Sequence, residues 1–335
     1  MADDPARIES CYDMASWVGR LRFFFRLTSP EHMLTTQADV DRARAVIAAA
    51  AGKERKDPAE LLDAKWTVAG ATHSQTGALI PVPFRMGGWV PAGLWPVAGL
   101  LAVSHAAPTS GVLAGLAALH VWNQTQIGCV TYFNGAFGDG GRPSRAFWES
   151  YACAIGSAVS ITFGVGAYMR LRPPKLAWVA RLAPFPAVCA ANIANTYFMR
   201  RAELETGLLV RRPQEQGGDG AGGGGAPVGR SKEAARQAIA ETCAVRVLIP
   251  AANFIVAPLV LMALERRFEA FNFTRFPRRL LPVQVGATAL AMGLVLPVSL
   301  ALFPHETSIV VSDMEPLDGS SGSGEAERFH YNKGL

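Results

Sequence analysis

The chain carries its longest uncharged run, MGGWVPAGLWPVAGLLAVSHAAPTSGVLAGLAALHVWNQTQIGCVTYFNGAF, at residues Met86–Phe137. A membrane crossing needs roughly 20 consecutive apolar residues. Pro91, Pro96 and Pro108 interrupt the run. It therefore predicts either one long span near residues 89–122 or a broken pair, Trp89–Val103 and Pro108–Trp122. We adopt the single span and keep the pair as the alternative.

Four further apolar blocks follow, and each ends at charged or polar residues. They cover residues 147–169, 176–199, 238–264 and 280–303. Together with the first run they predict an all-α polytopic membrane protein of about five transmembrane helices, with six as the alternative. We expect this transmembrane domain to occupy residues 86–304.

The segments on either side of these blocks are polar. In the N-terminal segment, residues 1–85, the apolar periodicity predicts short helices near 38–51 and 58–71. Residues 11–30 are amphipathic, so they either lie at the membrane interface or form a packed cap on the membrane domain. Glycine-rich composition predicts a flexible loop at 211–229 and a flexible C-terminal tail at 305–335.

The overall composition excludes several classes of protein. Half of the residues are hydrophobic and 18% are charged, against about 25% in soluble proteins. The net charge of +5 is spread without a basic stripe, which argues for anionic lipid and against nucleic acid as a partner. The five cysteines are widely spaced, and phosphate-loop, GxSxG and metal-binding histidine motifs are absent from the sequence. We expect no enzymatic activity, metal or cofactor.

The apolar blocks contain polar residues that need a structural or functional reason. Asn192 and Asn195 share one helical face, which indicates either hydrogen bonds between helices or a stripe that faces a solute. Pro250 and Pro258 flank Asn253 and free backbone groups at depth, as in the interrupted helices of many transporters. Arg246 either meets a solute carboxylate or extends to a lipid headgroup.

Small residues recur every four positions at Gly156, Ser160 and Gly164. Such a ridge lets two membrane helices approach closely. We expect it to pack against a neighbouring helix.

Several segments follow the pattern of one known family. The strongest match is PFPAVCAANIANTYFMRRAELETG at Pro184–Gly207, and GRSKEAARQAI at Gly229–Ile239 also matches. Further matching elements are Tyr12-Asp13, Trp17-Val18-Gly19-Arg20, Phe84-Arg85-Met86, Val90-Pro91, Pro297–Pro304, Ser308-Ile309 and Glu315-Pro316. Together these segments resemble the sideroflexin family.

Two polar motifs of the family are altered in this chain. Its HPDTGE loop appears as HSQTGA, which keeps His73, Thr76 and Gly77 but loses both acids and the proline. Its NQSxNxxxNYxNR motif keeps Asn123, Gln124 and Asn134 but loses two asparagines and the arginine. Since buried polar groups discriminate strongly between solutes, these departures put the solute in doubt.

The resemblance implies a carrier of the mitochondrial inner membrane that imports serine or related small neutral amino acids for one-carbon metabolism, by alternating access without nucleotide hydrolysis. The candidate solute-binding residues are Asn123, Gln124, Asn134, Asn192, Asn195, Arg246 and Asn253, and His73, Thr76 and Gly77 form a candidate gate. Lys and Arg are more numerous in the segments that five crossings would place on the N-terminal side, which favours a matrix location for the N-terminus. The oligomeric state stays open.

Two other functions compete with this one. One is a carrier of di- or tricarboxylates, for which the apolar blocks offer few cations beyond Arg85, Arg181 and Arg246. The other is a scaffold without transport activity that affects respiratory-complex assembly or iron homeostasis.

Overall fold

The computed structural model describes residues 8, 11–50, 58–73, 76–103, 109–134, 143–171, 182, 184–211, 227–272, 275–303, 306–311, 315–316 and 327–332. Within these residues the protein is an all-α polytopic membrane protein, as predicted, with nine α-helices and one small sheet. The helices are α1 (Trp17–Leu27), α2 (Gln37–Ala50), α3 (Pro58–Ala71), α4 (Trp89–Val103), α5 (Ser110–Asn134), α6 (Arg145–Leu171), α8 (Pro184–Thr206), α9 (Lys232–Arg267) and α10 (Leu280–Leu302). Short 3₁₀ turns occupy η2 (Pro30–Leu34), η3 (Val82–Phe84), η4 (Met86–Gly88), η5 (Glu269–Phe271) and η6 (Pro277–Arg279).

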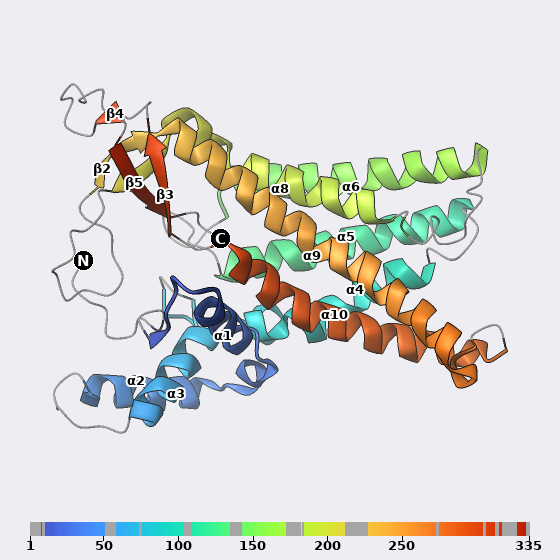
Figure 1. The fold of residues 1–335 in the computed structure, drawn as a ribbon, viewed down its shortest axis with the longest axis horizontal. Helices are drawn as coiled ribbons and strands as arrows, with labels where there is room; N and C mark the ends of the chain where they lie inside the picture. The colour runs from blue at the N-terminus through green and yellow to red at the C-terminus, as the bar shows by residue number, and fades with distance from the viewer. Residues whose placement is uncertain are drawn as a thin grey trace.

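The long helices form a closed ring. Each of α4, α5, α6, α8, α9 and α10 packs against the next, and α10 returns to α4. Consecutive helices run in opposite directions, so the N-terminal helices and the small sheet lie at the same end of the bundle (Figure 1). The ring encloses an interior that side chains of α4, α5, α8, α9 and α10 reach.

The segment predicted as one span near residues 89–122 contains two helices, α4 and α5. The residue before a proline disfavours helical geometry, and α4 ends ahead of Pro108. Four helical segments of the described residues are long and apolar enough to cross a membrane, namely Met86–Val103, Arg145–Leu171, Lys232–Arg267 and Leu280–Leu302. Between them in the chain lie α5 and α8, which carry most of the polar residues singled out above.

The predicted block at 176–199 differs most from its helix. Residues 172–181 and 183 lie outside the described part, and α8 continues to Thr206, beyond the charges expected to end it. Arg200 forms an ion pair with Glu203 one turn later, at 2.6 Å. Hydropathy indicates where a helix leaves an apolar environment, but not where the helix ends. Ion pairs between residues one turn apart stabilise the helix beyond that point.

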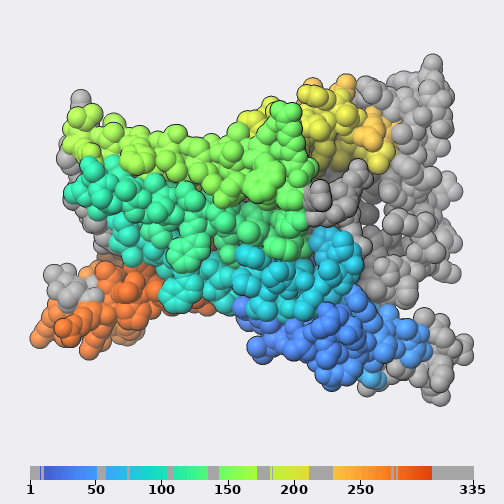
Figure 2. Space-filling model, turned by 180° about the vertical axis from the view of Figure 1, so that it is seen from behind, coloured from blue at the N-terminus to red at the C-terminus, as the bar shows by residue number. Residues whose placement is uncertain are grey.

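Large apolar side chains cover the outside of the ring. Trp95, Trp122, Trp148, Tyr168 and Leu290 are each at least half exposed. Figure 2 shows the continuous outer face that α5 and α6 form, with the N-terminal helices projecting at one end. An exposed apolar surface of this kind marks contact with lipid or another apolar partner.

The N-terminal segment forms a packed cap on the bundle, which decides between the two alternatives for residues 11–30. Phe23 and Phe24 of α1 are buried with Trp66 of α3 in one cluster that also includes Ala301 of α10. The Nε of Arg20 donates to the Ala301 carbonyl at 2.9 Å. That carbonyl lies in the last turn of α10, where backbone carbonyls have no hydrogen-bond partner within their own helix.

The predicted flexibility of the tail is wrong for three of its segments. Strands β3 (Glu306–Val311), β4 (Glu315–Pro316) and β5 (Glu327–Asn332) join β1 (Leu208–Arg211) and β2 (Pro227–Ser231) in one sheet, in the order β3-β5-β1-β2-β4. β3 and β5 pair antiparallel from Glu306↔Asn332 to Val311↔Glu327. The composition argument fails because the glycines and serines that suggested disorder lie between the strands, while β-branched residues dominate β3. The centre of the predicted glycine-rich loop, residues 212–226, lies outside the described part.

The expected packing of the small-residue ridge on α6 is also wrong. A side chain at Gly156 or Gly164 would meet no described atom within 4 Å. Close packing on α6 instead involves Gly166, where an added side chain would collide with Leu113 of α5. Spacing alone does not indicate which face of a helix points inward.

Candidate functional site

A cavity of about 550 Å³ lies inside the ring, at the end nearest the N-terminal helices. Cavities of roughly 300–1,000 Å³ are typical of sites for small molecules. Side chains of α4, α5, α8, α9 and α10 form its walls, and Phe23, Phe24 and Leu27 of α1 contribute at its outer end. The polar residues of the wall are Thr72, Trp89, Asn123, Gln126, Thr131, Asn134, Asn192, Thr242, Arg246 and Asn253.

A proline in α9 prepares the contact between α8 and α9. Pro250 has no backbone N–H, so the carbonyl of Arg246, four residues earlier, lacks its usual partner in the helix. The Nδ2 of Asn192 donates to this carbonyl at 2.9 Å. Asn192 therefore joins α8 to α9 at the point where the cavity begins.

The guanidinium of Arg246 is held at the same level. Its Nη1 donates to Oδ1 of Asn195 at 3.2 Å. Among the described residues that line the cavity, Arg246 is the only one that carries a full charge, and no described acid forms an ion pair with it. The cavity therefore has a single positive charge without a carboxylate to balance it.

Helix α5 supplies the opposite polar wall. Asn123 is buried and lies deep in the cavity, whereas Asn134 lies near the N-terminal end of the bundle. Asn134 donates to the backbone carbonyl of Phe84 at 2.7 Å, and Gln126 donates to that of Pro83 at 2.9 Å. These bonds fix α5 against the segment that leads into α4.

Two buried polar atoms of the cavity wall have no hydrogen-bond partner within the described part of the chain. They are Nε1 of Trp89, a donor, and Oδ1 of Asn253, an acceptor. Buried polar groups are normally paired, and a partner from a bound solute or water would satisfy both. A donor and an acceptor in the wall of one cavity suit a small polar molecule.

Apolar side chains close the deep end of the cavity. Leu100, Phe254 and Met292 line it and also belong to one buried cluster with Leu113 and Leu116 of α5. The cavity therefore reaches about halfway through the bundle from the N-terminal end.

The sequence-predicted residues separate into two groups. Asn123, Asn134, Asn192, Arg246 and Asn253 all line the cavity, and Asn195 contacts it through Arg246. Gln124 is buried on α5 but is not part of the cavity wall.

The candidate gate residues form a tight turn beside the cavity. The N–H of Gly77, which has a positive φ of 66°, donates to the His73 carbonyl at 2.8 Å, and the Thr76 N–H donates to Nδ1 of His73 at 3.2 Å. Only the neighbouring Thr72 reaches the cavity. The other positions of the loop, Ser74 and Gln75, lie outside the described residues.

Sequence reasoning missed Trp89, Thr242 and His120. Trp89 and Thr242 line the cavity, and His120 is fully buried on α5. A histidine inside an uncharged run was a signal that could have been followed. Nothing in the local sequence distinguishes Trp89 from the other tryptophans.

The other two arginines that could have bound an anionic solute are Arg85 and Arg181. Arg85 donates through Nε to the Ile80 carbonyl at 2.9 Å and through Nη1 to the His32 and Thr35 carbonyls at 2.7 and 2.9 Å. It is a buried link between η2 and the start of α4. Arg181 lies outside the described residues.

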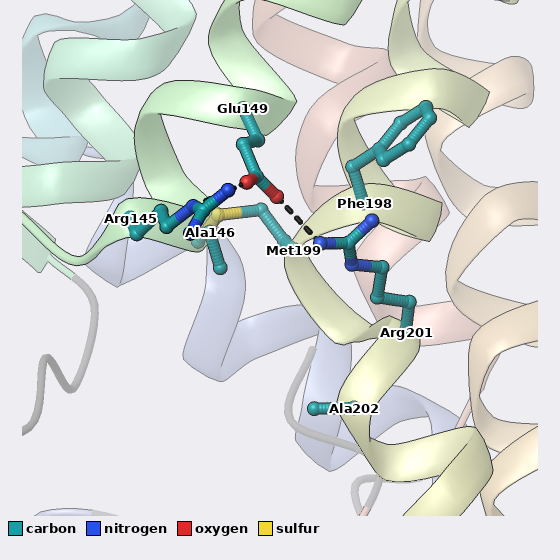
Figure 3. A pocket seen from close by; sticks show the side chains of 7 residues that line it. All are labelled: Arg145, Ala146, Glu149, Phe198, Met199, Arg201 and Ala202. Atoms are coloured by element: carbon teal, nitrogen blue, oxygen red, sulfur yellow. Dashed lines mark hydrogen bonds and ion pairs between the residues drawn. The ribbon is translucent and has the colours of Figure 1, made fainter.

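A second, outer groove of about 360 Å³ lies between the N-terminal end of α6 and the C-terminal end of α8 (Figure 3). Glu149 sits between two arginines there, at 2.8 Å from Arg145 Nε and 2.6 Å from Arg201 Nη2. The groove's charges are paired with each other and partly exposed to solvent, so it is a surface ion-pair network. In the described part of the chain, no group of three His, Cys, Asp or Glu side chains is placed to hold a metal.

Comparisons with known proteins find sequence similarity over nearly the whole chain. A sequence profile of the family described as sideroflexins matches residues 8–335. Human sideroflexin-5 is 33% identical over 97% of this chain and 91% of its own length. Sheep sideroflexin-1 is 29% identical and sideroflexin FSF1 of Saccharomyces cerevisiae is 28% identical, each over 98% of this chain and 96% of its own length. No solved structure matches the chain.

Proposed function

The chain belongs to the sideroflexin family, and from this membership we propose that it carries small neutral amino acids, L-serine first, across the mitochondrial inner membrane. Import of serine into the matrix would supply one-carbon metabolism. The cavity inside the ring is the proposed solute site, and transport proceeds by alternating access without nucleotide hydrolysis.

The single observation that carries this proposal is the polar interior of an otherwise apolar bundle. In a membrane domain, polar and ionisable side chains that face an internal cavity mark a solute path. Here Arg246, Asn192 and Asn253 face the cavity, whereas large apolar side chains cover the outside of the helices. A scaffold that does not transport has no need for this arrangement.

The charge of the cavity fits an amino-acid zwitterion. The guanidinium of Arg246 is the proposed partner of the solute carboxylate, since arginine binds carboxylates through paired N–H donors. The unpaired Oδ1 of Asn253 is the proposed acceptor for the ammonium group. A di- or tricarboxylate needs several convergent cations, and Arg246 is the only one on the described cavity wall.

The direction of the helices favours an even number of crossings. We propose that α5 and α8, despite their polar residues, cross the membrane with the four apolar helices, giving six crossings. The N-terminal cap and the sheet then share one side. We propose that this side faces the matrix, which the excess of Lys and Arg in the N-terminal segment supports. The boundaries of the transmembrane domain remain those of the sequence prediction, residues 86–304.

Uptake of labelled L-serine into liposomes that contain the purified protein tests the proposal. We expect saturable uptake that unlabelled alanine, glycine and cysteine reduce and citrate does not. A double substitution, Asn192→Ala with Asn195→Ala, should lower the uptake at least tenfold, because it releases Arg246 from both of its described contacts. The matched control is Thr125→Val, which also removes a hydrogen bond between helices, that of the Thr125 hydroxyl with Tyr151 of α6 at 2.8 Å, but at an exposed position of α5 that does not line the cavity.

The outcome that contradicts the proposal is uptake no faster than into empty liposomes, for serine and for every competitor, with insertion of the protein verified. Inhibition by citrate as strong as by alanine would instead transfer the assignment to a carboxylate carrier.

A further inference from the structure

Two polar side chains of α5 are buried within one helical turn of Asn123, which lines the cavity. His120 and Gln124 have exposed fractions of 0% and 2%. Both ring nitrogens of His120 and both amide atoms of Gln124 are buried without a hydrogen-bond partner among the described residues. Neither residue is part of the cavity wall.

The positions of these residues continue the polar stripe of the cavity. With 3.6 residues per turn, His120 lies on the same face of α5 as Ile127, Thr131 and Asn134, which line the cavity. On the other side, the same face continues to Leu113 and Leu116 of the closing cluster. His120 and Gln124 therefore stand at the boundary between the cavity and the apolar cluster.

An unpaired polar group is costly in the interior of a membrane protein, and such groups mark the paths of solutes and ions. If these two side chains only packed, apolar side chains of similar shape would serve better, because replacing unpaired buried polar groups is neutral or stabilising. A neutral imidazole and an amide each offer one side that donates and one that accepts. Together they can hold a hydroxyl, a carboxylate or an ammonium group.

We propose that His120 and Gln124 form a second solute contact, which a small polar solute occupies after the apolar cluster of Leu100, Phe254 and Met292 separates and the bundle opens at its far end. The solute leaves Arg246 and Asn253 and is received on α5, where His120 lies about one helical turn deeper than Asn123. This inference rests on the proposed transport and adds a contact that belongs to the other conformational state. It assigns His120 a role that the sequence motifs did not suggest.

Separate measurements of binding and exchange test the inference. The variants are His120→Leu and Gln124→Met, which remove the polar groups and keep most of the volume, with Thr125→Val as the control on the outer face of the same helix. Equilibrium binding of labelled L-serine to the detergent-solubilised protein reports the open cavity. Exchange of labelled for unlabelled serine across liposomes reports passage through both states.

We expect both variants to be at least as stable to heat as the unaltered protein and to bind serine within twofold of its affinity. Exchange should fall at least tenfold in each, and the Thr125→Val control should exchange at the unaltered rate. Exchange within twofold of the unaltered protein in both variants would overturn the inference and leave His120 and Gln124 as packing residues.

A tenfold loss of binding together with the loss of exchange would also overturn it, because the pair would then belong to the same site as Asn123. Failure of the proposed function looks different. In that case the unaltered protein and the Thr125→Val control neither bind nor exchange serine. The inference about His120 and Gln124 then fails together with the proposed function.

Discussion

At the residue scale, the proposed site depends on one missing backbone N–H. Pro250 leaves the carbonyl of Arg246 without its partner in α9, and Asn192 of α8 provides a substitute at 2.9 Å. The same arginine contacts Asn195 at 3.2 Å through its side chain. Two neighbouring asparagines thus bind the backbone and the side chain of one residue on the facing helix.

This arrangement predicts a coupling between Asn192 and Pro250. Asn192→Leu should lower the free energy of unfolding by about 1–3 kcal/mol, because it leaves a buried carbonyl unpaired. In a Pro250→Ala background the cost should be smaller, because position 250 then has an N–H for that carbonyl. Denaturant unfolding of the four proteins in detergent gives the coupling energy, and an equal cost in both backgrounds would contradict this description of the contact.

Some of these contacts follow from the sequence and some do not. The shared face of Asn192 and Asn195, and the free carbonyl created by Pro250, can be derived from helix periodicity and proline chemistry. The partners cannot, because Asn192 and Arg246 lie 54 residues apart and Asn134 lies 50 residues from Phe84. The position of Gln124 outside the cavity wall, one residue from Asn123, depends on the rotation of α5 about its axis, which only packing determines.

At the element scale, the N-terminal helices form a cap whose stability responds to pH through His32. The ring of His32 is buried and stacks on Trp66 with centroids 6.0 Å apart. Its Nε2 donates to the Arg26 carbonyl at 2.9 Å. Burial is the main cause that lowers the pKa of His32 below its usual 6.5.

Because the pKa is lower in the folded state, the unfolded state binds the proton more readily. The contribution of His32 to stability is therefore complete above pH 6.5 and is lost as the pH falls toward the folded-state pKa. We expect the melting temperature to decrease between pH 7.5 and pH 5.5 by more in the unaltered protein than in His32→Gln, whose side chain stays neutral. Equal decreases in the two proteins would show that other groups cause the pH dependence.

Most of the helices can be predicted from the sequence, but the ends of the long helices cannot. The predictions near 38–51 and 58–71 correspond to α2 and α3 within one residue. The long blocks correspond to α6, α9 and α10, but α9 begins at Lys232, six residues before the apolar block. Ser231 caps it by accepting from the Ala234 N–H at 3.1 Å, so a capping residue decides where this helix begins and hydropathy does not.

At the scale of the whole molecule, the ring of alternating helices has the N-terminal helices and the sheet that contains β5 at the same end (Figure 1). A protease added to sealed vesicles should therefore remove tags at the N-terminus and at the C-terminus together or protect both. With five crossings, one tag would be protected while the other is cut. A tag in the segment between α8 and α9 is the control, because it should behave as the two ends do.

The sequence predicted the class of this molecule but not its closure into a ring. Apolar blocks and excluded charges are local properties, so they indicate an all-α membrane domain. The return of α10 to α4 and the sheet formed from β1, β2 and the tail join segments far apart in the chain. The closure of the ring creates the cavity, which is why the candidate residues could be named from the sequence but their arrangement could not be predicted.

The central claim is that Arg246 holds the carboxylate of an amino acid inside the ring. The most direct test is the affinity of the purified protein for L-serine and for ethanolamine, which lacks the carboxylate, before and after Arg246→Gln. We predict saturable serine binding that the substitution weakens by roughly 10- to 150-fold, as expected for about 1.5–3 kcal/mol from a hydrogen bond to a charged group, and no ethanolamine binding to either protein. Equal serine affinity in both proteins, or ethanolamine binding as tight as that of serine, would contradict the claim.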